Sequence, residues 1–129
     1  MDVLLSIKPE YVNEIISGNK KYEFRRTIFK RNDIENIYIY STAPEKKIVG
    51  FFKVGKIISD KPETLWENLK ESSGIKKEDF FKYFNQKDIG FAIEIQELEI
   101  FSKPKHLESI TPPQSFCYIE YLPELWVDM

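Results

Sequence analysis

The spacing of apolar and polar residues changes several times along the chain, and each change predicts a different element. Residues 3–7 form an apolar run with the length of a buried strand. A helix is predicted next, because Pro9 suits a first helical position and Gly18 suits the left-handed residue that ends a helix. One face of this helix would carry Tyr11, Val12, Ile15 and Ile16. That apolar face predicts packing of the helix against a sheet.

From Lys20 the period of the pattern becomes two, which predicts a strand. Tyr22 and Phe24 fall on one side of it, and Lys21, Glu23 and Arg25 on the other. We expect the aromatic side chains to face the interior and the charged side chains to face solvent. Lys20 has the opposite parity from Glu23 and Arg25, so the three charges converge only if the strand begins irregularly at residue 20 or 21.

The remaining elements follow from β-rich, alternating and helical segments. Further strands are predicted at 36–42, 46–59, 89–101 and 115–122, and helices at 62–74 and 76–87. Gly50 and Gly55 suggest bulges or bends in a curled sheet. Five to six short strands, a helix after the first strand and a helical insertion at 62–85 predict an α+β fold around a small barrel.

Composition is that of one folded domain. The 129 residues are enough for a single core, and 42% hydrophobic with 31% charged residues is ordinary globular usage. Cys117 is the only cysteine, so no internal disulfide is expected. No apolar run is long enough to cross a bilayer, and the start of the chain does not resemble a signal peptide. We therefore expect a cytoplasmic protein without a membrane partner, in an oligomeric state that the sequence does not define.

Charge is distributed unevenly along the chain. The net charge of -2 argues against a broad, non-specific coat of nucleic acid. Yet residues 20–31 carry six Lys or Arg against Glu23 alone. One interpretation is a local site for an anion. The other is a solvated strand edge whose charges discourage aggregation, and charge alone leaves both open.

Several common catalytic and metal-binding patterns are missing. His106 is the only histidine, and neither His106 nor Cys117 has a partner at ligand spacing, so no metal site or cofactor is expected. The chain has no Gly-rich phosphate loop of the strand-to-helix type and no Gly-flanked nucleophilic Ser. Nucleotide hydrolysis and α/β-hydrolase chemistry are therefore disfavoured. We expect His106 in a loop and Cys117 as a small core residue.

The segment around residue 20 resembles the signature of the ASCH domain family, a branch of the PUA-like small β-barrels. Its G-x-K-x-x-E-x-R pattern is matched by Gly18, Lys20, Glu23 and Arg25. The preceding strand, the Lys8-Pro9 turn and the first helix also resemble that family. The resemblance extends over most of the chain and implies a single ASCH domain, residues 1–129, with a PUA-like barrel. The helical pair would be a variable insertion.

The resemblance implies an RNA-related role, in RNA metabolism or translation-linked regulation. Lys20 offers a point charge to a phosphate or carbonyl, and Arg25 a planar fork for phosphate or a base. Glu23 would pair with Arg25, accept from a base amino group or act as a general base. The candidates for the lining of the same pocket are Lys8, Gly18, Tyr22, Tyr40 and Ser41. The alternative is that Glu23 and Arg25 form an ion pair that only stabilises the strand.

Whether the chain is an enzyme stays open at this stage. Some relatives are amidohydrolases that deacylate an N4-acylated cytidine with a Lys, a Thr and a Glu. Lys20 matches that Lys, but Glu23 stands where the Thr is expected. Other relatives resemble ribonucleases that use Lys, Tyr and Arg, and Lys20, Tyr22 and Arg25 are close together.

Three hypotheses therefore remain. The favoured one is a module that binds single-stranded RNA, a nucleotide or a modified nucleoside. The second is a small hydrolase with Lys20 and Glu23 as catalytic groups, Lys20 stabilising negative charge and Glu23 acting as general base. The third is a protein-interaction domain that uses the acidic C-terminal end.

Overall fold

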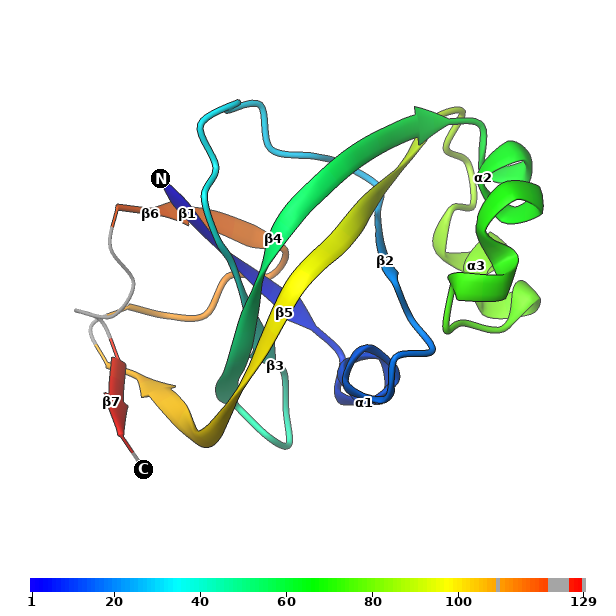
Figure 1. The fold of residues 1–129 in the computed structure, drawn as a ribbon. Helices are drawn as coiled ribbons and strands as arrows, with labels where there is room; N and C mark the ends of the chain where they lie inside the picture. The colour runs from blue at the N-terminus through cyan, green and yellow to red at the C-terminus, as the bar shows by residue number, and fades with distance from the viewer. Residues whose placement is uncertain (109, 121–125, 129) are drawn as a thin grey trace.

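The computed structural model describes residues 1–108, 110–120 and 126–128. These residues form one curled sheet with three α-helices (Figure 1). The strands are β1 (Asp2–Ile7), β2 (Tyr22–Arg25), β3 (Ile37–Ser41), β4 (Lys47–Asp60), β5 (Gly90–Leu107), β6 (Phe116–Ile119) and β7 (Trp126–Asp128). The helices are α1 (Pro9–Ser17), α2 (Pro62–Leu69), the 3-10 turn η1 (Lys70–Ser72) and α3 (Lys77–Tyr83).

Six strands lie in the order β2-β5-β4-β3-β1-β6, and β7 pairs with β5. β1 and β3 are parallel because α1 and β2 connect them, whereas the other pairs are antiparallel. The α+β barrel-like fold and the five to six strands predicted for it thus agree with the six strands in this order. β7 is an additional strand, and of the predicted strand 115–122 the last two residues lie outside the described part.

The long strands β4 and β5 curl the sheet (Figure 1). Their pairing shifts register at three places, between Ile48 and Gly50, between Phe51 and Lys53, and between Val54 and Ile57. Gly50 is needed at the first, because a Cβ there would collide with the backbone oxygen of Glu99. The bends predicted from the glycines are therefore present.

The first helix has the predicted ends. Pro9 is its first residue, and Gly18 follows it with φ of 87°, a left-handed conformation that costs glycine little. Val12 and Ile15 are buried against the sheet, but Ile16 is 48% exposed. The prediction that Ile16 packs on the sheet is therefore wrong, since the buried stripe of this short helix is narrower than the apolar stripe in the sequence.

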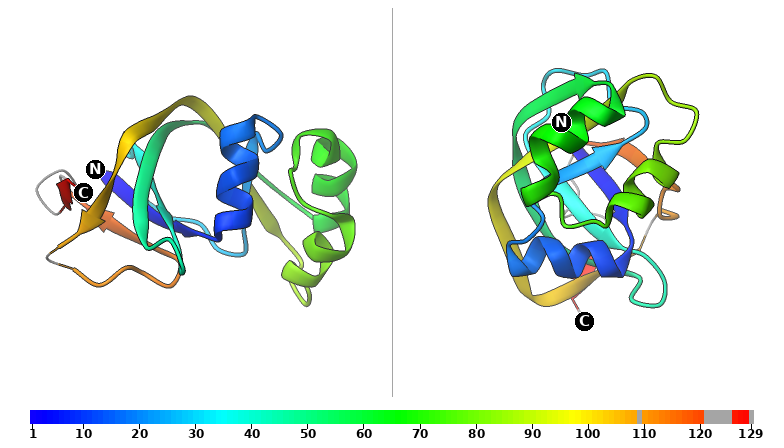
Figure 2. Two further views of the ribbon diagram at one scale, coloured as in Figure 1. Left: turned by 90° about the horizontal axis from the view of Figure 1, so that it is seen from below. Right: turned by 90° about the vertical axis from the view of Figure 1, so that its right-hand side faces the viewer.

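The helical pair α2 and α3 packs on β2 and β5, at the end of the molecule opposite to β7 (Figure 2). Phe24 of β2 contacts Phe80 edge to face with ring centroids 5.0 Å apart, and Phe84 at 6.4 Å. Such edge-to-face pairs add to the apolar burial. The aromatic side of β2 is therefore covered by the inserted helices, as its alternation predicted.

The two isolated residues considered as metal ligands lie in strands. Cys117 is in β6 and packs partly buried against a core cluster, as predicted. His106 pairs with Val127 of β7, so its prediction as a loop residue is wrong. The reason is that β5 continues through Pro104 to Leu107, because β7 supplies its last pairing partner.

Candidate ligand-binding cleft

The motif residues converge because β2 starts irregularly. Lys20 lies before the first residue of β2, Tyr22, and forms an isolated bridge with Ser73 of the helical insertion. Its neighbour Lys21 donates its backbone N–H to the Ser72 oxygen at 2.9 Å. This isolated bridge replaces regular strand pairing, so the alternation of side chains in β2 does not determine the side to which Lys20 points. The strand thus begins irregularly at residues 20 and 21, which the sequence analysis required for Lys20 to converge with Glu23 and Arg25.

Glu23 is the centre of a cluster of three charges. Its Oε1 lies 3.7 Å from Lys20 Nζ, and its Oε2 lies 3.3 Å from Arg25 Nη1. Only 5% of Glu23 and 3% of Lys20 is exposed. The expectation that the charged side of β2 faces solvent holds for Lys21, which is exposed, but is wrong for Glu23, because the cleft walls from α1 and α3 cover this part of the strand.

Lys20 is held in an unusual environment for an ammonium group. Nζ donates a hydrogen bond to the backbone oxygen of Ser73 at 3.0 Å. It also lies 4.6 Å from the ring centroid of Phe24 and 5.5 Å from that of Tyr11. Burial lowers the pKa of Lys20 below its ordinary value, and the nearby Glu23 carboxylate opposes this effect.

Arg25 joins β2 to two other parts of the chain. Its Nη1 donates to the backbone oxygen of Ser6 in β1 at 3.4 Å, and its Nη2 donates to Ser115 Oγ. Ser6 Oγ in turn donates to the backbone oxygen of Pro113 at 2.7 Å. These bonds fix the guanidinium plane and bring the segment before β6 to the edge of the cluster.

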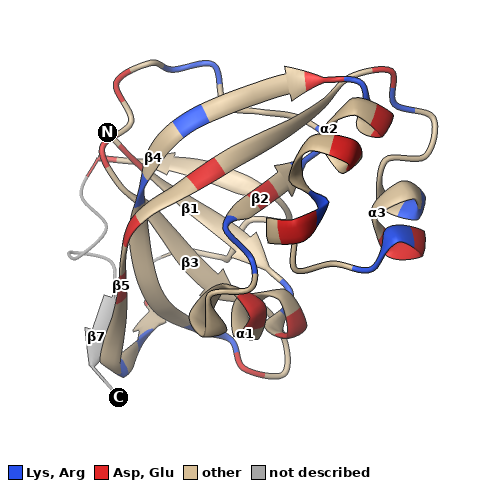
Figure 3. Ribbon diagram, turned by 45° about the vertical axis from the view of Figure 1, so that its right-hand side comes forward, with Lys and Arg blue, Asp and Glu red and all other residues tan. Residues whose placement is uncertain are grey.

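The charge cluster forms the floor of a cleft of about 730 Å³. This volume lies within the range of small-molecule and cofactor sites. One wall comes from the start of α1, with Lys8 and Tyr11, and another from α3, with Asp79, Lys82 and Tyr83. In Figure 3, β2 lies between α1 and the helical pair α2 and α3.

Four of the eight residues predicted for the pocket line this cleft, namely Lys8, Lys20, Glu23 and Arg25. Gly18 contributes the turn that ends α1. Tyr22 packs with the aromatic cluster under the helical pair, and Tyr40 belongs to a core cluster on β3. Ser41 is also buried in β3, although the next residue, Thr42, reaches the cleft.

Tyr83 is the main lining residue that the sequence analysis missed. Its hydroxyl accepts a hydrogen bond from the backbone N–H of Arg26 at 3.2 Å. The Arg26 guanidinium donates to the backbone oxygens of Tyr83 at 2.7 Å and Asn85 at 2.9 Å, which ties the end of α3 to β2. Burial raises the pKa of Tyr83. Its spacing of three from Phe80 placed it on the packed side of α3, but no local signal related it to Glu23.

Two further features concern the described residues only. They contain no group of three or more His, Cys, Asp or Glu side chains arranged to hold a metal ion. Among their helices, none is long and apolar enough to span a bilayer.

The fold and the cleft define a class of small domains in which a curled sheet and a short helix enclose a charged motif. The ASCH domain model matches residues 5–102, so the chain belongs to the ASCH domain family. The predicted family and the α+β PUA-like fold are thereby confirmed.

Among similar proteins is an "ASCH domain-containing ribonuclease" of Zymomonas mobilis, 26% identical over 92% of this chain and 84% of that protein. A crystal structure of ASCH from Zymomonas mobilis matches with a TM-score of 0.86 and 25% identity, covering 98% of this chain and 96% of that one. The chain is also 25% identical over 92% of its length to the ATP synthase subunit alpha of Ureaplasma parvum, but spans only 15% of that protein.

Proposed function

We propose that the chain, as a single ASCH domain of residues 1–129, binds single-stranded RNA in the cleft floored by Lys20, Glu23 and Arg25. The observation that carries this proposal is a buried Lys20 beside a partly buried Arg25 at the bottom of a cleft of about 730 Å³. The similarity to a protein named as a ribonuclease supports RNA as the ligand. The proposed role is in RNA metabolism or translation-linked regulation.

The lining chemistry suits one strand of RNA rather than a duplex. Arg25 and Lys20 provide charge-assisted donors for a phosphate oxygen. Tyr11 of α1 and Tyr83 of α3 both line the cleft and offer rings for stacking of unpaired bases. Glu23 keeps the two cations in place and offers oxygens to a base amino group. The single cysteine fits a reducing compartment, so the proposal places this RNA in the cytoplasm.

The test is a titration of fluorescently labelled single-stranded RNA with wild type and with Lys20→Ala/Arg25→Ala, at two salt concentrations. We expect salt-dependent anisotropy changes that the double variant loses. Because the double variant leaves Glu23 without its partners, Lys82→Ala, at an exposed position of the wall, serves as a second and milder variant. Absence of binding at low salt, or binding unaffected in folded variants, refutes the proposal.

Cleavage of the RNA is a second candidate function. It is favoured by the relative named as a ribonuclease and by the buried Lys20, whose pKa is lowered by burial. In this reaction the ribose 2′-oxygen attacks the adjacent phosphorus to form a 2′,3′-cyclic phosphate, and the 5′-oxygen leaves with a proton from a water molecule in the cleft. The proton taken up by Glu23 then passes to the hydroxide left from that water. Glu23 would remove the proton from the 2′-hydroxyl, Lys20 would stabilise the added negative charge, and Arg25 would position the phosphate.

A gel of the same RNA separates the two candidates. Turnover that is lost in Glu23→Gln while binding is retained supports cleavage, and a DNA strand of the same sequence, which lacks the 2′-hydroxyl, is expected to stay intact. RNA that remains uncut leaves binding as the function. Deacylation of an N4-acylated cytidine has no supporting observation in the cleft, where Glu23 occupies the position of the expected Thr.

A further inference from the structure

The charges that line the cleft almost cancel. Among the described lining residues the cations are Lys8, Lys20, Arg25 and Lys82, and the carboxylates are Glu10, Glu23 and Asp79. Four cations against three anions leave a net charge of +1. A surface that follows the backbone of a nucleic acid needs several unpaired cations, one for each phosphate that it neutralises.

This balance is built into each part of the cleft. On the floor, the Glu23 carboxylate lies within 3.7 Å of Lys20 and 3.3 Å of Arg25, so it offsets one of their two charges. At the mouth, α1 brings Lys8 together with Glu10, and α3 brings Asp79 together with Lys82, all four exposed. Each wall therefore contributes one charge of each sign, and the excess positive charge comes from the floor.

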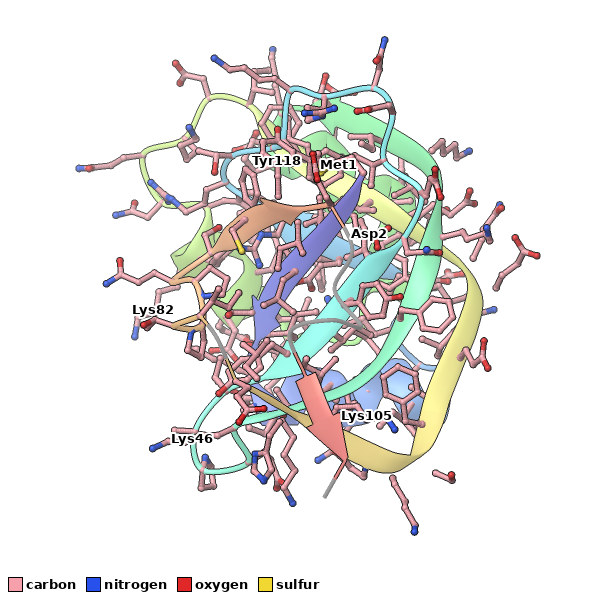
Figure 4. The ribbon with its side chains drawn as sticks, turned by 90° about the vertical axis from the view of Figure 1, so that its left-hand side faces the viewer. Met1, Asp2, Lys46, Lys82, Lys105 and Tyr118 are labelled. Carbon is pink, nitrogen blue, oxygen red and sulfur yellow. The ribbon has the colours of Figure 1, made fainter. Side chains whose placement is uncertain are left out.

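Two arginines of the basic segment at residues 20–31 do not line the cleft and are already paired within the chain. Arg26 uses its guanidinium on two backbone oxygens, and Arg31 pairs with Asp33 at 2.6 Å. In Figure 3 both the Lys and Arg positions and the Asp and Glu positions are spread over the strands, helices and loops of the described chain. Lys46 and Lys105, which do not line the cleft, lie apart from each other and from the lining residue Lys82 in Figure 4.

We propose that the cleft takes a single phosphodiester of RNA together with its two flanking nucleosides, and does not follow a longer backbone. This inference rests on the proposed binding of single-stranded RNA. A phosphodiester carries one negative charge, which matches the excess of one positive charge in the lining. A cleft of about 730 Å³ is a volume for a compact ligand of this kind and not for an extended strand.

The inference predicts a shallow dependence on salt. For single strands, the slope of log K against log salt concentration is about −0.7 for each phosphate neutralised. One phosphodiester therefore predicts a slope of about −0.7, whereas contact with four would predict about −2.8. A longer strand adds only more equivalent positions, so its affinity should grow no faster than its number of phosphodiesters.

The experiment measures binding of an RNA hexamer and an RNA dodecamer with the same repeated sequence, from about 50 to about 200 mM KCl. If the gel shows cutting, 2′-O-methyl versions replace the RNA. We expect slopes of about −0.7 for both lengths and about a twofold higher affinity for the dodecamer. A slope steeper than about −2, a slope that grows with length, or a slope near zero would each overturn the single-phosphodiester inference. The proposed RNA binding would stand in all three cases. If neither oligonucleotide binds, the proposed function fails and this inference fails with it.

A pair of matched variants tests whether the balance is local to the cleft. Asp79→Asn removes a lining carboxylate, and Asp88→Asn removes an exposed carboxylate that does not line the cleft. We expect Asp79→Asn to raise the affinity for the hexamer about fivefold at low salt, because one unit charge at close range in water is worth about this factor. Asp88→Asn should change it less than twofold. Equal effects of the two variants would contradict a local charge balance.

Discussion

Replacement of Glu23 by glutamine is the most informative single change in the cleft. It keeps the shape of the side chain and removes the charge that lies between Lys20 and Arg25. Because Lys20 is 3% exposed and the Arg25 side chain is 11% exposed, neither cation can be fully solvated when the carboxylate is gone. The variant therefore leaves the buried charge of Lys20 and the partly buried charge of Arg25 close together without a neutralising partner.

The size of the effect follows from the burial of the cluster. Removal of one partner of a buried ion pair destabilises a protein by about 3–5 kcal/mol. Arg25 retains its bonds to Ser6 and Ser115, Lys20 retains Ser73, and the cleft admits water on one side. We therefore expect a loss at the lower end of this range, about 3 kcal/mol in the free energy of unfolding. This loss is a large share of the total, because the free energy of unfolding of a domain is typically about 5–15 kcal/mol.

Urea unfolding, followed by tryptophan fluorescence, measures this loss. The control is Glu45→Gln at the exposed turn between β3 and β4, which should change the stability by less than about 0.5 kcal/mol. Added phosphate should stabilise Glu23→Gln more than wild type, because an anion bound at the floor of the cleft then meets two cations whose charge no carboxylate offsets. A loss below about 1 kcal/mol with an unchanged denaturant slope would show that the carboxylate does not hold the cluster together.

Three further predictions concern the surroundings of the cluster. Gly74→Ala should lower the free energy of unfolding by about 3 kcal/mol and weaken RNA binding, because a Cβ at this left-handed residue (φ of 59°) collides with Lys20. Gly18→Ala, at φ of 87° with open space around it, should lower the free energy of unfolding by about 1 kcal/mol. Equal losses for the two variants in urea unfolding would contradict the collision. The lowered pKa of Lys20 means that the unfolded chain binds more protons than the folded chain just below 10.5, the ordinary pKa of lysine. The stability of wild type relative to Lys20→Met should therefore rise as the pH approaches 10.5 from below, and a fall would refute the burial argument. Burial raises the pKa of the Cys117 thiol, so iodoacetamide should alkylate it more slowly in the folded protein than in urea at the same pH, and equal rates would contradict this.

Much of the fold was predictable because its signals are local. Pro9 and Gly18 define the ends of α1 through the backbone angles that they favour, and Gly50 marks a bend through the space that it leaves. In β2, the alternation of Phe24 with Glu23 and Arg25 correctly separated an aromatic side from a charged side. Such patterns need no knowledge of distant residues.

Predictions failed where the environment of a strand was set by distant elements. All five residues of β3 are buried, so its side chains carry no alternation that distinguishes a core side from a cleft side. Tyr40 and Ser41 were for this reason assigned to the pocket on residue type alone. The charged side of β2 was assigned to solvent because a period of two separates two faces but does not say what covers either of them. His106 was assigned to a loop because the strand that pairs with it comes some twenty residues later.

The sequence by itself determined the order of the elements, the polarity of their faces and the motif that contains Lys20, Glu23 and Arg25. Only the tertiary structure decided that α3 closes the cleft with Asp79 and Tyr83, and that the lining charges sum to +1. The physical reason is that backbone conformation and polarity depend on neighbours in the chain. The burial, pKa and net charge of a site depend on which distant side chains fold against it.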